Sequence, residues 1–139
     1  MKLLATAMLA LAVISGCSGG SDDRLENANE FREKLGQLDY DVELEPKFEA
    51  HPGMVIGKAT SEDGVDSSFA FMFGPAPERL PFKLESNGAV WLNFGDEANY
   101  WIEEFPLGLT PLESDRVLDM RFAIEDASCQ VIADRDCGA

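Results

Sequence analysis

The sequence predicts an α+β fold in which an N-terminal amphipathic helix packs on an antiparallel β-meander of six to eight strands. Apolar residues recur every three or four positions from residue 25 to residue 38, which is the period of an amphipathic helix. From residue 39 onward, apolar and polar residues mostly alternate, which is the period of a half-buried strand. A small β-barrel with a flanking helix is the alternative that fits the same signals.

The predicted helix has one apolar stripe, formed by Leu25, Ala28, Phe31, Leu35 and Leu38. Acidic residues fill its first turn, where the helix dipole favours negative charge. Glu30 and Lys34 are spaced as a favourable i,i+4 pair. A helix that is apolar on one side must cover another apolar surface, and the strands that follow supply one.

The expected strands cover residues 39–45, 54–60, 65–73, 82–86, 89–94, 100–105 and 117–125, and a short strand or helical turn covers 128–133. The third of these has phenylalanines at 69, 71 and 73 on one face and Ala70 and Met72 on the other. A strand that is apolar on both faces is expected in the middle of a layered structure. Asn87-Gly88 favours a tight hairpin between 82–86 and 89–94, because both residues tolerate positive φ.

The first sixteen residues have the layout of a secretory signal peptide. Lys2 supplies a positive charge, Leu3 to Ile14 form an almost unbroken apolar run, and Ser15 and Gly16 precede Cys17. A membrane-spanning helix needs about 20 apolar residues, and this run is well short of that length. The leader is therefore expected to be removed rather than to span the membrane.

The stretch Ile14-Ser15-Gly16-Cys17 resembles the lipobox of bacterial lipoproteins. The resemblance implies cleavage after Gly16, acylation of Cys17 and firm attachment to a membrane through that lipid. Residues 1–16 are then the signal peptide, 17–21 the lipidated cysteine and a flexible tether, and 22–139 a single acidic β-rich domain. The implied location is the cell envelope. In a Gram-negative host it is the outer membrane, facing the periplasm, because Ser18 is not the Asp that resembles an inner-membrane retention signal.

The chain is strongly acidic. It has 11 Lys and Arg against 26 Asp and Glu, which gives a formal net charge of −15. Such a surface repels phosphate groups, so no nucleic acid is expected as a partner. Cations or basic proteins are the favoured partners, and keeping the surface solvated is the other explanation of the acidity.

Two cysteines remain once Cys17 is acylated, namely Cys129 and Cys137. An even number of cysteines in an oxidising compartment predicts one disulfide. Closing so short a loop is expected to stabilise the fold by roughly 2–3 kcal/mol. A redox role is not expected, because the two cysteines do not have C-x-x-C spacing.

Two groups of residues are candidate binding surfaces. The first is a row of alternating acids, Asp39, Asp41, Glu43 and Glu45. Strand periodicity places these four carboxylates on one face, where a cation or a basic partner would relieve their repulsion; a solvated strand face is the other interpretation. The second is a candidate aromatic patch formed by Trp91, Tyr100 and Trp101, which either binds a ligand or protein or belongs to the core.

The sequence contains no recognisable catalytic or metal-binding motif. Its one histidine, His51, lies in the turn-like stretch His51-Pro52-Gly53, and no serine has a G-x-S-x-G context. We therefore expect no catalytic residue, metal or cofactor. The predicted function is a non-enzymatic, envelope-anchored protein-binding module. The alternative is a carrier of a small apolar ligand in a β cup, and an enzyme of unrecognised type ranks third.

Overall fold

The computed structural model describes residues 21–75, 78, 89–93, 97–103 and 106–132. These residues form two helices and five strands. In chain order they are α1 (Ser21–Gly36), β1 (Asp41–Leu44), β2 (Met54–Thr60), β3 (Asp66–Phe73), β4 (Ala89–Asn93), β5 (Ala98–Glu103) and α2 (Pro111–Cys129). The fold class is α+β with an antiparallel sheet, as the sequence predicts.

The strands form one open sheet in the order β1-β2-β3-β5-β4, and every neighbouring pair is antiparallel. β3 lies at the centre, as its two apolar faces predict. β1 and β4 lie at opposite edges, so the described strands do not close into the barrel considered as the alternative fold. The expectation of six to eight strands is wrong for the described part of the chain, which has five.

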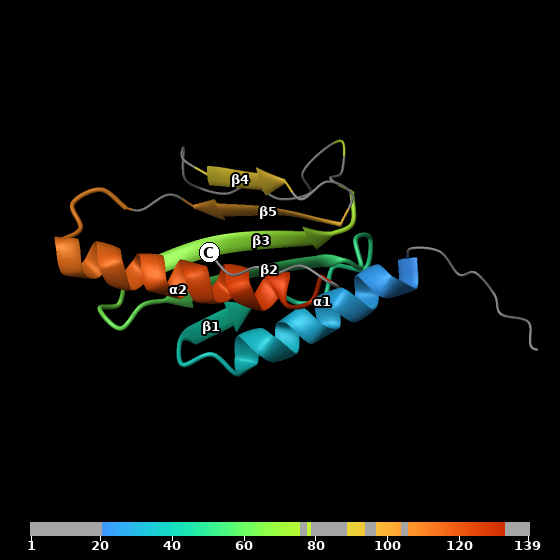
Figure 1. The fold of residues 1–139 in the computed structure, drawn as a ribbon, viewed down its shortest axis with the longest axis horizontal. Coiled ribbons are helices and arrows are strands. Elements are labelled where there is room, and N and C mark those ends of the chain that lie inside the picture. The colour runs from blue at the N-terminus through green and yellow to red at the C-terminus, as the bar shows by residue number, and fades with distance from the viewer. Residues whose placement is uncertain (1–20, 76–77, 79–88, 94–96, 104–105, 133–139) are drawn as a thin grey trace, which may run out of the picture.

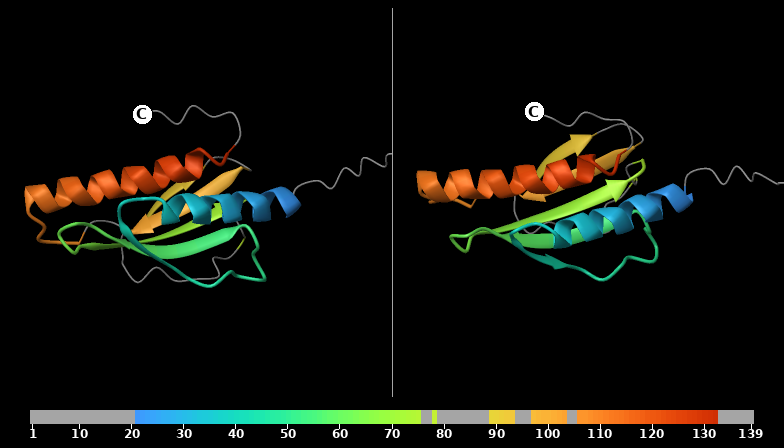
Figure 2. Two further views of the ribbon diagram at one scale, coloured as in Figure 1. Left: turned by 90° about the horizontal axis from the view of Figure 1, so that it is seen from below. Right: turned by 60° about the horizontal axis from the view of Figure 1, so that its bottom comes forward.

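Both helices cover the same face of the sheet (Figures 1 and 2), so the molecule has one helical layer and one sheet layer. The main core lies between these layers. From α1 it includes Ala28, Phe31 and Leu35, which belong to the predicted apolar stripe, whereas Leu25 of the same stripe is 41% exposed. The helix therefore packs through a narrower strip than the sequence pattern indicates.

Phe71 of β3 is the centre of the aromatic contacts in this core. Its ring centroid lies 4.7 Å from that of Phe31 on α1, 5.7 Å from that of Phe69 and 4.6 Å from that of Tyr100 on β5. Phe31 also contacts Phe73 edge-on at 5.6 Å. Aromatic pairs in this distance range contribute packing energy beyond the area they bury, so these rings hold α1 on the sheet.

The first turns of α1 are fixed by Arg24, which lies over two glycines. A Cβ atom at Gly74 would approach Nε of Arg24 to 2.6 Å, and one at Gly53 would approach Cβ of Arg24 to 3.2 Å. Gly74 also has φ of +106°, a conformation that L side chains rarely adopt. Glycine at these positions lets the start of α1 lie close to the ends of β2 and β3.

The segment 117–125 is helical and not the strand that its alternation predicts, because α2 extends from Pro111 to Cys129. A capping box starts the helix: the backbone N–H of Glu113 donates to Oγ1 of Thr110, and the backbone N–H of Thr110 donates to Oε2 of Glu113 at 2.7 Å. The backbone N–H and the hydroxyl of Thr110 both donate to the Glu113 carboxylate, and these two hydrogen bonds hold its pKa below the usual value. The first two residues of the short element expected at 128–133 belong to the last turn of this helix.

The Asn87-Gly88 hairpin and its first strand, 82–86, lie outside the described residues. The second strand predicted for that hairpin coincides with β4, whose described partner is β5, with Trp91 opposite Trp101 in the register. The leader, Cys17 and Cys137 also lie outside the described part of the chain, so the lipidation and the Cys129–Cys137 disulfide stay predictions.

Replacing Phe71 with alanine should lower the free energy of unfolding by about 3–5 kcal/mol, because the cavity would lie among three other aromatic rings. Phe122→Ala is the matched control, since Phe122 lies on the surface and its truncation should cost less than about 1 kcal/mol. Urea denaturation followed by circular dichroism measures both. Equal losses for the two variants would contradict the central role of Phe71.

Candidate functional site

Helix α2 has an inner arc that packs on the sheet. Its buried residues are Val117, Met120, Arg121, Ile124, Ala127 and Ser128. At 3.6 residues per turn these positions lie on one side of the helix. Met120 and Ile124 are almost completely buried in the main core, so the inner arc holds α2 on the sheet.

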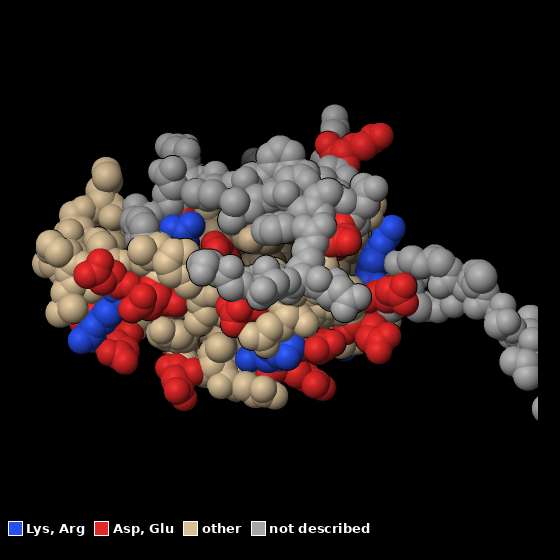
Figure 3. Space-filling view, in the orientation of Figure 1, with Lys and Arg blue, Asp and Glu red and all other residues tan. Residues whose placement is uncertain are grey.

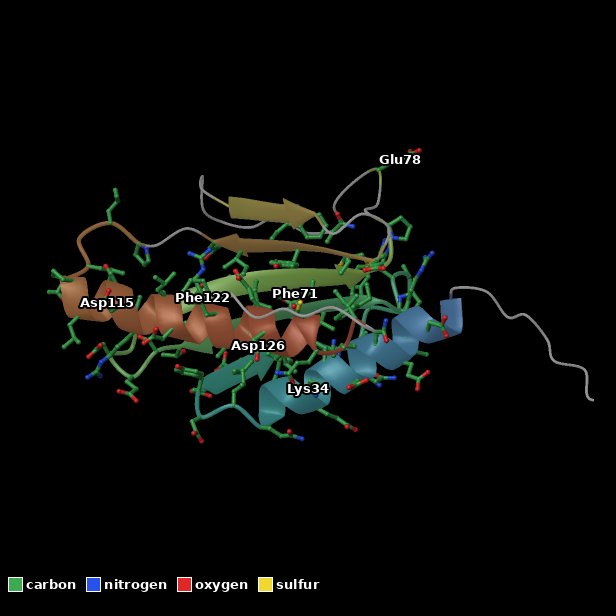
Figure 4. All side chains as sticks on the ribbon, viewed as in Figure 1. Lys34, Phe71, Glu78, Asp115, Phe122 and Asp126 are labelled. Atoms are coloured by element: carbon green, nitrogen blue, oxygen red, sulfur yellow. The ribbon has the colours of Figure 1, made fainter. Side chains whose placement is uncertain are left out.

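The opposite side of α2, which we call the outer arc, is unusual because it also carries large apolar residues. Leu112, Leu118 and Phe122 are 59%, 36% and 54% exposed, respectively. Three exposed carboxylates share this side: Asp115, Asp119 and Asp126. Figure 4 shows Asp115, Phe122 and Asp126 following one another along the helix. The outer arc is the described surface with the largest group of exposed apolar side chains on one element.

The outer arc is not predicted by the sequence pattern, because the alternation over 117–125 indicates a strand rather than a helix. Leu118 and Phe122 alternate with polar residues in the same way as Met120 and Ile124, although the two pairs lie on opposite sides of α2. The signal that predicts the helix is Thr110-Pro111-Leu112-Glu113, which combines an N-cap threonine, proline at the first helical position and glutamate at the third.

A small polar cluster lies between α2 and β5. Arg121 and Tyr100 are buried and Glu125 is partly buried. Burial raises the pKa of the Glu125 carboxyl, and the nearby positive charge of Arg121 offsets part of that effect. Burial raises the pKa of the Tyr100 hydroxyl, and the negative charge of Glu125 raises it further. The charge of Glu125 on α2 therefore affects the ionisation of Tyr100 on β5.

The acidic row predicted on 39–45 is exposed along its whole length, and Asp41 and Glu43 lie on the edge strand β1. The chain itself supplies a cation there: Nζ of Lys58 on β2 lies 3.5 Å from a carboxylate oxygen of Glu43 and 3.5 Å from one of Asp66. These two carboxylates raise the pKa of the Lys58 ammonium. Among the described residues, no three His, Cys, Asp or Glu side chains are grouped closely enough to hold a metal ion.

The predicted aromatic patch is not formed by Tyr100 and Trp101. Both side chains are buried, and as neighbours on β5 they point to opposite faces of the sheet. Tyr100 belongs to the core under the helices, whereas Trp101 packs with Met54, Ala70 and Met72 on the other face. Of the two interpretations left open by the sequence, the core is the correct one for Tyr100 and Trp101, and the side chain of Trp91 lies outside the described residues.

The exposed face of α1 has a shallow hollow of about 570 Å³ that opens widely to solvent. Its described lining consists of Leu25, Glu26, Asn29, Glu30 and Glu33. The lining is mostly acidic and polar, which differs from the enclosed apolar cavity typical of a carrier of small apolar ligands. One of these carboxylates, Glu30, already lies 3.8 Å from Nζ of Lys34.

Comparisons with protein families, with curated proteins and with solved structures find no match for this chain. In the part of the chain that the structure describes, neither helix is both long and apolar enough to cross a membrane.

The Glu125→Gln variant tests the half-buried carboxyl under α2. Because its pKa is raised in the folded state, Glu125 contributes most to stability below about pH 4, near its ordinary unfolded pKa. That contribution is lost as the pH rises through the raised folded value, whereas glutamine does not titrate. We compare the urea midpoints of the two proteins. We expect the midpoint of Glu125→Gln to increase relative to that of the wild type between about pH 4 and pH 7. A difference that falls over this range would contradict the assignment.

Proposed function

We propose that this protein is a non-enzymatic interaction module, held at the cell envelope by lipid on Cys17, that binds another protein through the outer arc of α2. The observation that carries the proposal is the exposure of Leu112, Leu118 and Phe122 on the side of α2 opposite the core. Full burial of a leucine or phenylalanine side chain stabilises a contact by roughly 1.5–3 kcal/mol. A partner that covers this side of α2 therefore gains binding free energy from burying these side chains.

Single apolar side chains on a surface are common and need no function. The outer arc differs because its apolar residues lie together on one element. Leu118 and Phe122 are four residues apart and are therefore neighbours on the helix surface, and Leu112 lies nearer the start of the same arc. Contiguous exposed apolar residues rimmed by polar ones are typical of protein-binding surfaces. This supports a binding role for α2 over a purely structural one.

The lipid anchor restricts where such binding takes place. α1 begins at Ser21, four positions after Cys17. Whatever its conformation, that stretch of chain spans at most about 14 Å. If Cys17 is acylated, the start of α1 must therefore stay close to the membrane surface. The partner would then be another protein of the envelope or one that comes to it.

Replacing Cys17 with serine should prevent acylation and release the protein from the membrane fraction, because serine provides no thiol for the lipid. Membrane fractionation and mass spectrometry of the native chain measure this. Cys129→Ser is the control, since Cys129 lies at the end of α2 and its loss should leave the anchor intact. An unmodified thiol at position 17 of the wild type, or an uncut leader, would refute the proposed anchor.

Replacing Phe122 with serine should reduce partner recovery by about tenfold, since roughly 1.4 kcal/mol of lost apolar contact changes a binding constant by that factor. The measurement is affinity capture from envelope extract with the full chain in mild detergent, at low and at high salt. Leu25→Ser is the matched control, because Leu25 is a similarly exposed apolar residue on α1. Loss of the partner with Leu25→Ser but not with Phe122→Ser, or no specific partner at all, would contradict the proposal.

A further inference from the structure

The outer arc of α2 carries three carboxylates that have no ion pair within the described part of the chain, although Oδ2 of Asp126 accepts a hydrogen bond from Nε2 of Gln130 at 2.7 Å. Among the described residues, no Lys or Arg forms an ion pair with Asp115, Asp119 or Asp126. The two arginines of α2 are engaged elsewhere. Arg116 contacts Glu62 at 2.9 Å and Asp63 at 3.3 Å at the side of the helix, and Arg121 is buried on the inner arc. The outer arc therefore presents three carboxylates beside its apolar residues, and Lys34 reaches only its C-terminal end, where Nζ donates to Oε1 of Gln130 at 3.4 Å.

Each of two other acidic surfaces contains one carboxylate paired with a lysine. Glu43 on β1 has Lys58, and Glu30 on α1 has Lys34. On the side of the molecule seen in Figure 3, carboxylates outnumber Lys and Arg among the described residues. On α2, three exposed apolar side chains lie beside carboxylates that have no ion pair among the described residues, whereas the acidic hollow on α1 has Leu25 as its one described apolar lining residue.

The spacing along α2 suits another helix. Asp115 and Asp126 are eleven residues apart, which is about 16 Å along a helix axis, and Leu118 and Phe122 lie between them. A helix laid along this surface presents its own side chains at intervals of three and four residues, which matches that arrangement. An extended strand would instead pair with a free sheet edge such as β1.

The charge selects the kind of helix. A second copy of this chain would place its own aspartates against these, and nucleic acid or an anionic membrane would be repelled in the same way. We infer that the outer arc of α2 docks a basic amphipathic helix of the partner protein, which places an apolar stripe on Leu118 and Phe122 and Lys or Arg beside the three aspartates. The inference rests on the proposed function and specifies its partner.

A synthetic peptide tests the inference directly. The probe has about 18 residues, a leucine stripe at helical spacing and lysines along both flanks. One twin replaces every lysine with glutamate, and a second keeps the charge but has two central prolines that break the helix. Each is titrated into the full chain held in phosphatidylcholine vesicles, with empty vesicles as the blank, at low and at high salt.

We expect the basic helical peptide to bind, more tightly at low salt, and both twins to bind at least about tenfold more weakly. Phe122→Ser should weaken binding by about tenfold at either salt concentration. Asp115→Asn with Asp119→Asn should weaken it several-fold at low salt only. The matched control is Asp41→Asn with Glu45→Gln, which removes the same charge from the acidic row and should change affinity by less than about twofold.

Equal binding of the proline twin, equal loss with the control variant or no binding by the parent peptide would overturn the inference. The proposed function can survive this failure. If capture of the native partner depends on Phe122 at both salt concentrations but the basic peptide does not displace it, only the assigned partner chemistry is wrong. If capture does not depend on Phe122, the proposed function fails as well.

Discussion

The contact of Phe31 with Phe71 joins the helical layer to the sheet, and the remaining packing is arranged around it. Phe71 lies on the central strand and also contacts Tyr100 on the next strand, so one ring connects α1, β3 and β5. Close packing makes such a cluster intolerant of lost volume. The positions of both helices follow from it, because α2 packs Met120 and Ile124 into the same core beside α1. The outer arc of α2 therefore faces solvent because its inner arc is fixed.

Helix α2 carries large apolar side chains on its exposed side as well as on its buried side. Its inner arc must be apolar to cover the sheet, yet Leu118 and Phe122 place apolar groups in water on the other side. A helix that only stabilised this fold would do better with polar residues there. Sequences tend to break such local rules at functional positions, which is the physical reason for proposing that this surface binds a partner. The capping box at Thr110 and Glu113 provides helix stability that does not depend on this pattern.

The acidic residues have different effects in different parts of the fold. At Lys58 and Arg116 the fold pairs carboxylates with its own cations, and such exposed pairs contribute little to stability. Beneath α2, a single carboxyl has a larger effect on stability, because burial disfavours the charged form of Glu125. On the outer arc the carboxylates have no described ion-pair partner, and in water they cost little until something approaches. An uncompensated charge of this kind selects partners by sign and speeds their encounter.

The sequence by itself determined the α+β class, the antiparallel pairing and the central place of β3, because local periodicity encodes which faces of a strand are apolar. It also predicts a leader and carries the lipobox resemblance at Cys17, both of which depend on composition and order alone. Tertiary structure decided that residues 117–125 are helical and that Tyr100 and Trp101 point to opposite faces. In both cases the reason is that an apolar residue looks the same in sequence whether it faces the core, the far side of the sheet or water. Only packing against the rest of the chain distinguishes these environments, and it placed Phe122 in water.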